Sequence, residues 1–163
     1  MFVLARAVVY ATLFISLVLV LVPTRLLSWS GVSGPAVLRL WQLTGMILTV
    51  AGGALALWCV VTFAWMGQGT PAPFDPPRRL VVRGPYAIVR NPMYLGAVLA
   101  LAGAALFYES GALATYSLAF LLATHAFVRW YEEPALRARF GAEYDAYCRR
   151  VGRWWPHRGI GAT

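Results

Sequence analysis

Lysine is absent from this sequence, and acidic and metal-binding side chains are scarce. The 163 residues include 14 basic residues, all arginine, against six aspartates and glutamates, with only two cysteines and two histidines. No Cys-x-x-Cys pair and no Cys/His spacing typical of a metal site occurs. Cys59 lies in a long apolar run and Cys148 in the basic C-terminal part, so we predict neither a disulfide nor a bound metal.

Apolar residues, in contrast, are abundant and make up 60% of the chain. That is too many for the core of one small soluble domain. The sequence therefore predicts an all-α integral membrane protein with about four transmembrane helices, since a helix crosses the hydrocarbon core with about 20 residues. The four apolar runs, of which the first and third are short, are Ala7 to Val22, Leu40 to Trp65, Pro92 to Tyr108 and Ala112 to Tyr131.

The arginines are distributed unequally between the two sides that four spans define. Twelve fall on the side of the N-terminus, the 66–91 segment and the C-terminal tail, and two, Arg25 and Arg39, fall on the other. Since positive residues favour the cytoplasmic side, we expect both termini and the active site to be cytoplasmic. The arginines behind the net charge of +8 would then form a basic rim that faces anionic membrane lipids, and the charge requires no nucleic-acid partner.

Residues 1–65 are interpreted as two N-terminal transmembrane helices that pack and anchor. A cleaved signal peptide is the alternative for the first run, but a single arginine precedes it and no convincing cleavage site follows. The connection from Thr24 to Pro35 is predicted to be an outer interfacial loop. Small residues let helices approach closely and also permit a dimer, so the oligomeric state stays open. The glycines concerned are Gly45, Gly52 and Gly53.

Residues 66–163 are interpreted as the catalytic region, which begins with two contrasting segments. From Met66 to Pro77 the chain is too rich in proline for a regular helix, so an extended path is expected. The next stretch, Arg78 to Gly96, is basic and aromatic, and its Asn91 and Pro92 predict the N-cap and first residue of the third span. Such a helix start offers free N–H groups to a carboxylate or phosphate. The alternative is a basic juxtamembrane loop with a helix cap.

The fourth span carries ionisable residues at its C-terminal end. It forms a hairpin with the third span, because only three residues separate the two runs. His125, Arg129, Glu132 and Glu133 follow a spacing that predicts one helical face. Ionisable groups near a membrane usually face a cavity or a partner, so we predict a site there. The alternatives are a core histidine and a local ion pair between Arg129 and Glu133.

Apolar side chains recur at helical spacing after Pro134 and predict an amphipathic cytoplasmic tail helix, which Gly141 interrupts. We interpret this helix as a lid or as an interfacial helix. The compact aromatic-basic end that follows, Arg153 to Pro156, either anchors at the head groups or folds back over the site. The recurring residues are Leu136, Phe140, Tyr144, Tyr147 and Val151.

Two stretches of this sequence carry a resemblance to known proteins. They are GPYAIVRNPMYLG and, after the next span, RWYEEPALRARFGAEYDAYCRRVGRWWP. Together they resemble the isoprenylcysteine carboxyl methyltransferase family and related membrane phospholipid methyltransferases, over about half of the chain, from Thr70 to Pro156. The resemblance implies an enzyme that transfers a methyl group from S-adenosyl-L-methionine, bound at the cytoplasmic face, to a hydrophobic or lipid-like acceptor.

The resemblance also implies roles for individual residues. Glu133 binds a polar part of the cofactor, and Arg129 faces the methyl acceptor and is a catalytic candidate. Aromatic faces suit the sulfonium of the cofactor, and N–H groups or arginine suit its carboxylate. The other residues implied in cofactor binding are Arg78, Arg79, Leu80, Val81, Tyr86, Asn91, Pro92, Met93 and Tyr94.

Asn91 departs from the family pattern, because the eukaryotic carboxyl methyltransferases have histidine at this position. Asparagine cannot titrate, which excludes an acid/base role here and leaves the acceptor open. A carboxylate acceptor needs no base, and Arg129 would hold it. An amine acceptor, as in phospholipid N-methylation, must lose a proton, and His125 or a glutamate is then the catalytic candidate.

Two further readings remain at this stage. One is a membrane reductase of the sterol-reductase type, which is similar in having polar motifs around C-terminal hairpins and would use NADPH. The other is a non-catalytic membrane scaffold or lipid-binding protein, in which Tyr94, Arg129 and Glu133 would have no role in ligand binding.

Overall fold

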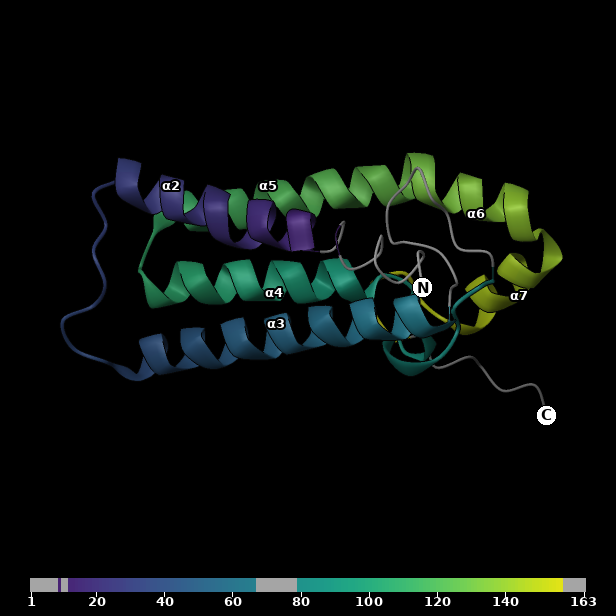
Figure 1. The fold of residues 1–163 in the computed structure, drawn as a ribbon, viewed down its shortest axis with the longest axis horizontal. Helices are drawn as coiled ribbons and strands as arrows, with labels where there is room; N and C mark the ends of the chain where they lie inside the picture. Colours follow the sequence, from purple (N-terminus) through teal and green to yellow (C-terminus); the bar gives the residue numbers. More distant parts are fainter. Residues whose placement is uncertain (1–8, 10–11, 67–78, 157–163) are drawn as a thin grey trace.

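The computed structural model describes residues 9, 12–66 and 79–156, and within them it confirms the predicted all-helical fold (Figure 1). Arg78 and nearly all of the proline-rich segment before it lie outside the described residues. Three helices are long and apolar enough to cross a membrane, and a fourth apolar helix is shorter. Large apolar side chains are exposed on their outer faces, as expected where lipid surrounds them.

The first long helix runs from Thr12 to Trp29 and contains a π-helical segment, η1 (Ser16–Leu21), followed by α2 (Val22–Trp29). The prediction that this span ends at Val22 and that a loop begins at Thr24 is therefore wrong. Pro23 does not end the helix. A proline lacks an N–H and clashes with the carbonyl one turn earlier, and the wider π-helical turn that precedes Pro23 relieves both problems.

Helices α3 (Leu40–Met66) and α4 (Pro92–Phe107) pack in close contact, as Figure 1 shows. A Cβ on Gly52 would lie 2.5 Å from the backbone of Gly96 and Ala100, and one on Gly45 would lie 2.6 Å from the Gly103 carbonyl oxygen. A Cβ on Gly53 would meet nothing within 4 Å. Two of the three glycines singled out in the sequence thus bring helices of the same chain together.

Helix α4 turns back into a hairpin with α5 (Gly111–Phe127), as predicted. The Ser110 side chain caps α5 by accepting from Leu113 N at 3.3 Å. The turn is also tied to the start of α3, because Trp41 Nε1 donates to the Glu109 carboxylate at 2.8 Å. The opposite end of the hairpin, where α4 begins, carries the predicted site residues Asn91, His125 and Glu133.

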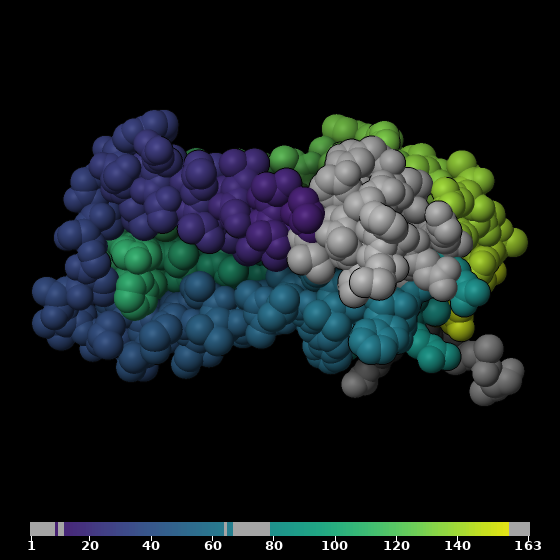
Figure 2. Space-filling model, viewed as in Figure 1, coloured from purple at the N-terminus to yellow at the C-terminus, as the bar shows by residue number. Residues whose placement is uncertain are grey.

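Helix α5 continues without a break through the π-helical segment η3 (Val128–Glu132) into α6 (Glu133–Phe140). The chain reverses at Gly141, whose φ of +52° suits glycine, and α7 (Ala142–Arg150) returns below α6 (Figures 1 and 2). Tyr144, Tyr147 and Val151 form a buried cluster packed against Leu80, Leu136, Phe140 and Cys148. Helix α7 and the tail after it are thereby held against the loop that leads into α4.

Candidate functional site

The loop before α4 is anchored by buried aromatic residues. Its 3₁₀ turn, η2 (Gly84–Ala87), starts at Gly84 with a φ of +59°. The ring of Tyr86 packs with Cys59 of α3 and Val81. Tyr147 of α7 donates its hydroxyl hydrogen to Tyr86 O at 2.6 Å. Burial raises the pKa of Tyr147, so the hydroxyl stays protonated and remains a donor.

The segment from Val151 to Pro156, which we call the C-terminal strap, lies along this loop. Val89 and Gly152 form an isolated parallel bridge, in which Arg90 N donates to Gly152 O at 2.9 Å. Asn91 occupies the N-cap position of α4, with Pro92 first in the helix, as predicted. Its side chain, however, does not cap the helix. Asn91 Nδ2 donates to Arg153 O at 3.3 Å, so the amide joins the start of α4 to the strap.

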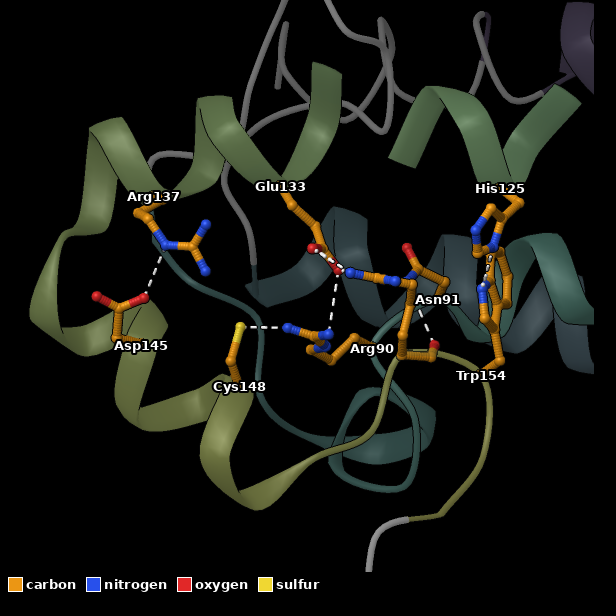
Figure 3. Close-up of polar contacts among 9 residues, drawn as sticks. Arg90, Asn91, His125, Glu133, Arg137, Asp145, Cys148 and Trp154 are labelled. Carbon is orange, nitrogen blue, oxygen red and sulfur yellow. Dashed lines mark hydrogen bonds and ion pairs between the residues drawn. The ribbon is translucent and has the colours of Figure 1, made fainter. Parts of the chain in front are cut away.

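Glu133 is the centre of a buried ionic cluster (Figure 3). Arg153 grips both carboxylate oxygens, with Nε at 2.7 Å from Oε1 and Nη2 at 2.7 Å from Oε2. Arg90 Nη2 lies 3.1 Å from Oε1, and the same guanidinium contacts the Cys148 sulfur. Glu133 itself is only 7% exposed. Such a bidentate, charge-assisted arrangement fixes the carboxylate in one orientation.

Glu132, the neighbouring acid, has a different partner. Tyr94, in the first turn of α4, donates its hydroxyl hydrogen to Glu132 Oε2 at 3.2 Å. The two adjacent carboxylates therefore reach two sides of one site. Glu132 meets the start of α4, whereas Glu133 meets the loop and the strap.

His125 contacts the strap one residue beyond Arg153. Trp154 Nε1 donates to His125 Nδ1 at 3.0 Å, and the two rings stack with centroids 6.1 Å apart (Figure 3). The strap thus touches three of the residues that the sequence singled out, Asn91, His125 and Glu133.

Arg129 does not share the environment of Glu133, although their spacing predicted one helical face. The Arg129 side chain is exposed, while Glu133 is buried. The reason is the π-helical turn of η3, which holds more residues per turn than an α-helix and rotates the face. The local ion pair considered for the two residues is absent from this part of the described chain, where Glu133 pairs with Arg90 and Arg153.

The remaining predicted cofactor residues line the loop and the start of α4. Val81, Tyr86, Asn91 and Pro92 are buried, Leu80, Met93 and Tyr94 are half-buried, and Arg79 is exposed. Sequence reasoning did not assign site roles to Arg90 or Tyr147, and for the end that contains Arg153 and Trp154 it left head-group anchoring and folding back over the site both open. A glutamate within the site needs cationic partners, which was a usable signal. The sequence, however, predicted twelve arginines on the same side and gave no means of choosing among them.

Comparison with known families gives a match. The family model described as phospholipid methyltransferase matches residues 40–143, which is well over half of the chain and runs from α3 into the start of α7. It includes Arg90, Asn91, Tyr94, Glu132 and Glu133. Neither the curated proteins nor the solved structures yield a match. The match confirms the resemblance seen in the sequence, since the two families belong to one group of membrane methyltransferases.

Proposed function

The chain belongs to the phospholipid methyltransferase family, and on that basis we propose that it transfers a methyl group from S-adenosyl-L-methionine to a lipid-like acceptor. The observation that carries the proposal is the Glu133 carboxylate held by Arg90 and Arg153 beside the start of α4. A buried, oriented acid next to a helix N-terminus is suited to a ligand that carries both a cation and an anion. Glu133 and Arg90 both lie within the matched residues.

The residues around Glu133 suit the groups of that donor, which has an α-ammonium, an α-carboxylate and a sulfonium. Glu133 offers a carboxylate to the ammonium. Arg90 offers a hydrogen-bond donor to the carboxylate, because its buried Nε has no partner among the described residues. The rings of Tyr86 and Tyr94 are of the kind that attracts a sulfonium. An ammonium bound at Glu133 would compete with Arg153 and would weaken the contact between the strap and α6.

When bound, the donor supplies an electrophilic methyl group, and the contribution of the protein is to align the acceptor with it. Alignment alone corresponds to effective molarities of about 10⁵ to 10⁸ M in well-oriented cases. Arg129 and His125 are our candidates for contacts with the acceptor. Arginine suits a carboxylate or phosphate oxygen. An acceptor that is an amine must also lose a proton, for which the glutamates and His125 are the candidates.

We further propose that this end of the bundle faces the cytoplasm. Nine described arginines belong to the loop before α4, to η3, α6, α7 and the strap, and two belong to α2 and the residue before α3 at the other end. An excess of arginine at one end of the transmembrane helices is typical of the cytoplasmic side of a membrane protein. The water-soluble donor would then enter from the cytoplasm and the acceptor from the bilayer, with residues 66–163 as the catalytic region and residues 1–65 as the anchor.

The experiment is methyl transfer from tritiated S-adenosyl-L-methionine by the full chain reconstituted in vesicles. One set of vesicles contains an aminophospholipid, phosphatidylethanolamine, and the other an S-farnesylcysteine amphiphile with a free carboxylate. Label released as volatile methanol by alkali identifies a methyl ester, and label stable to alkali identifies N-methylation. Transfer to either acceptor supports the proposal. Folded protein that labels neither acceptor, but reduces a sterol with NADPH, would contradict it.

A further inference from the structure

His125 and Trp154 come from elements far apart in the sequence, α5 and the C-terminal strap. The indole Nε1 lies 3.0 Å from His125 Nδ1, and the rings stack at 27°. Indole N–H is only ever a donor. His125 Nδ1 must therefore be the acceptor in this contact, which requires that it carry no proton.

That requirement sets the state of the whole imidazole ring. A neutral imidazole has one N–H and one acceptor nitrogen. With Nδ1 accepting from Trp154, the proton of neutral His125 is on Nε2. The ring nitrogen directed away from Trp154 is then a hydrogen-bond donor and has no lone pair with which to take a proton.

We infer that Trp154 is a positioning residue that fixes His125 as an Nε2–H donor, so that His125 binds an oxygen of the methyl acceptor and does not act as the general base. The inference rests on the proposed function for its meaning in the reaction. Its structural part, the tautomer of His125, stands independently of which reaction the protein catalyses.

The position of Trp154 is fixed by the two residues that precede it in the strap. The preceding residue, Arg153, holds Glu133 through two bonds of 2.7 Å and accepts from Asn91 through its carbonyl. Gly152 pairs with the loop through Arg90 N. The bonds from Arg90 N to Gly152 O and from Asn91 Nδ2 to Arg153 O do not involve Glu133, so they would hold the strap on the loop when a donor competes for that carboxylate. The indole is thus carried on a segment that stays anchored, as a positioning residue requires.

The consequence for the reaction is a division of roles. An acceptor that presents a carboxylate or phosphate oxygen can receive the Nε2–H of His125. An amine acceptor has to lose its proton to another group, and Glu132 beside Tyr94 is the other acid of the site. The transfer rate of a His125 variant should therefore depend on whether the new side chain donates a hydrogen bond, and not on whether it is basic.

The tautomer can be measured directly by ¹⁵N NMR of the full chain labelled only at histidine. The chain has two histidines, and a His157→Gln variant assigns the signals. The spectrum is recorded above the ordinary histidine pKa of about 6.5, where imidazole is neutral. We expect His125 Nδ1 to be unprotonated and Nε2 to be protonated. A protonated Nδ1 would overturn the inference.

Trp154→Phe keeps an aromatic ring and removes the indole N–H. We expect the His125 signals to shift toward a mixture of tautomers, and methyl transfer to the acceptor labelled in the vesicle assay to fall by roughly twofold, because an equal mixture halves the Nε2–H population. Trp155→Phe is the matched control, since Trp155 is 80% exposed. A Trp154→Phe protein with an unchanged tautomer would also overturn the inference.

Two substitutions of His125 separate donation from basicity. The glutamine amide donates a hydrogen bond but takes no proton at neutral pH. We expect His125→Gln to retain most of the transfer rate and His125→Ala to lose roughly tenfold. An equal loss of transfer rate in the His125→Gln and His125→Ala variants would identify His125 as a base and contradict the inference. Absence of any transfer by the unsubstituted protein would instead contradict the proposed function, while the tautomer measurement still decides the role of Trp154.

Discussion

Arg153 grips both carboxylate oxygens of Glu133, each at 2.7 Å, and so joins the C-terminal strap to the end of the longest helix. The contact connects a tail residue beyond the family match with an acid inside it. It places a positive group where the ammonium of the methyl donor is proposed to bind. The contact therefore both closes the site and marks the group that the donor would replace.

Arg153→Ala is expected to destabilise the fold. The buried Glu133 would keep Arg90 but lose two charge-assisted hydrogen bonds, at a cost of about 2 to 3 kcal/mol. Thermal unfolding in detergent, followed by circular dichroism, checks this against Arg149→Ala on the exposed side of α7. Equal melting temperatures for the two variants would show that the ion pair contributes nothing.

Tyr147→Phe should loosen the loop before α4. The variant leaves the Tyr86 carbonyl without its 2.6 Å partner in a buried setting, at a cost of about 1 to 2 kcal/mol. Amide hydrogen exchange over residues 79–91 is expected to rise, while exchange within α3 stays unchanged. Tyr131→Phe is the control, because Tyr131 is exposed. Equal exchange in the loop for both variants would mean that the Tyr147 hydroxyl does not anchor it.

Two adjacent glycines test the packing of α3 on α4. Gly52→Ala puts a Cβ 2.5 Å from backbone atoms of α4, which cannot move as a flexible side chain does, and should destabilise by about 1 to 3 kcal/mol. Gly53→Ala meets nothing within 4 Å and removes a helix-disfavouring residue, so it should be neutral or stabilising. The melting temperatures of the two variants give the comparison, and a reversed order would refute the described helix contact.

Hydropathy and proline position predicted the main helices well. The sequence placed α3 and α4 within one residue at each end, because long apolar runs and the Asn91–Pro92 start are local signals. The first helix was predicted too short because the span was equated with the apolar run that ends at Val22, whereas the helix continues through Pro23 after the π-helical η1. A π-helical turn has no clear local signature, and η3 misplaced Arg129 relative to Glu133 for the same reason.

The partners within the site could be predicted only in part. The sequence identified Asn91, Tyr94, His125 and Glu133 as candidate site residues, and the structure places them at one end of the bundle. It did not identify Arg153 and Trp154 as their partners, because the fold-back of the strap depends on long-range pairing of Gly152 with the loop. Tryptophan and arginine near the end of a membrane protein are equally typical of head-group anchoring.

The central claim, that Glu133 is part of a binding site for the methyl donor, is tested most directly by calorimetric titration of the detergent-purified chain with S-adenosylhomocysteine. Glu133→Gln removes the charge with little change of shape, and Glu143→Gln on the exposed side of α7 is the matched control. We expect binding by the unsubstituted chain and by Glu143→Gln, and its loss in a Glu133→Gln variant that remains folded. Undiminished binding by Glu133→Gln, or no binding by the folded unsubstituted chain, would contradict the account.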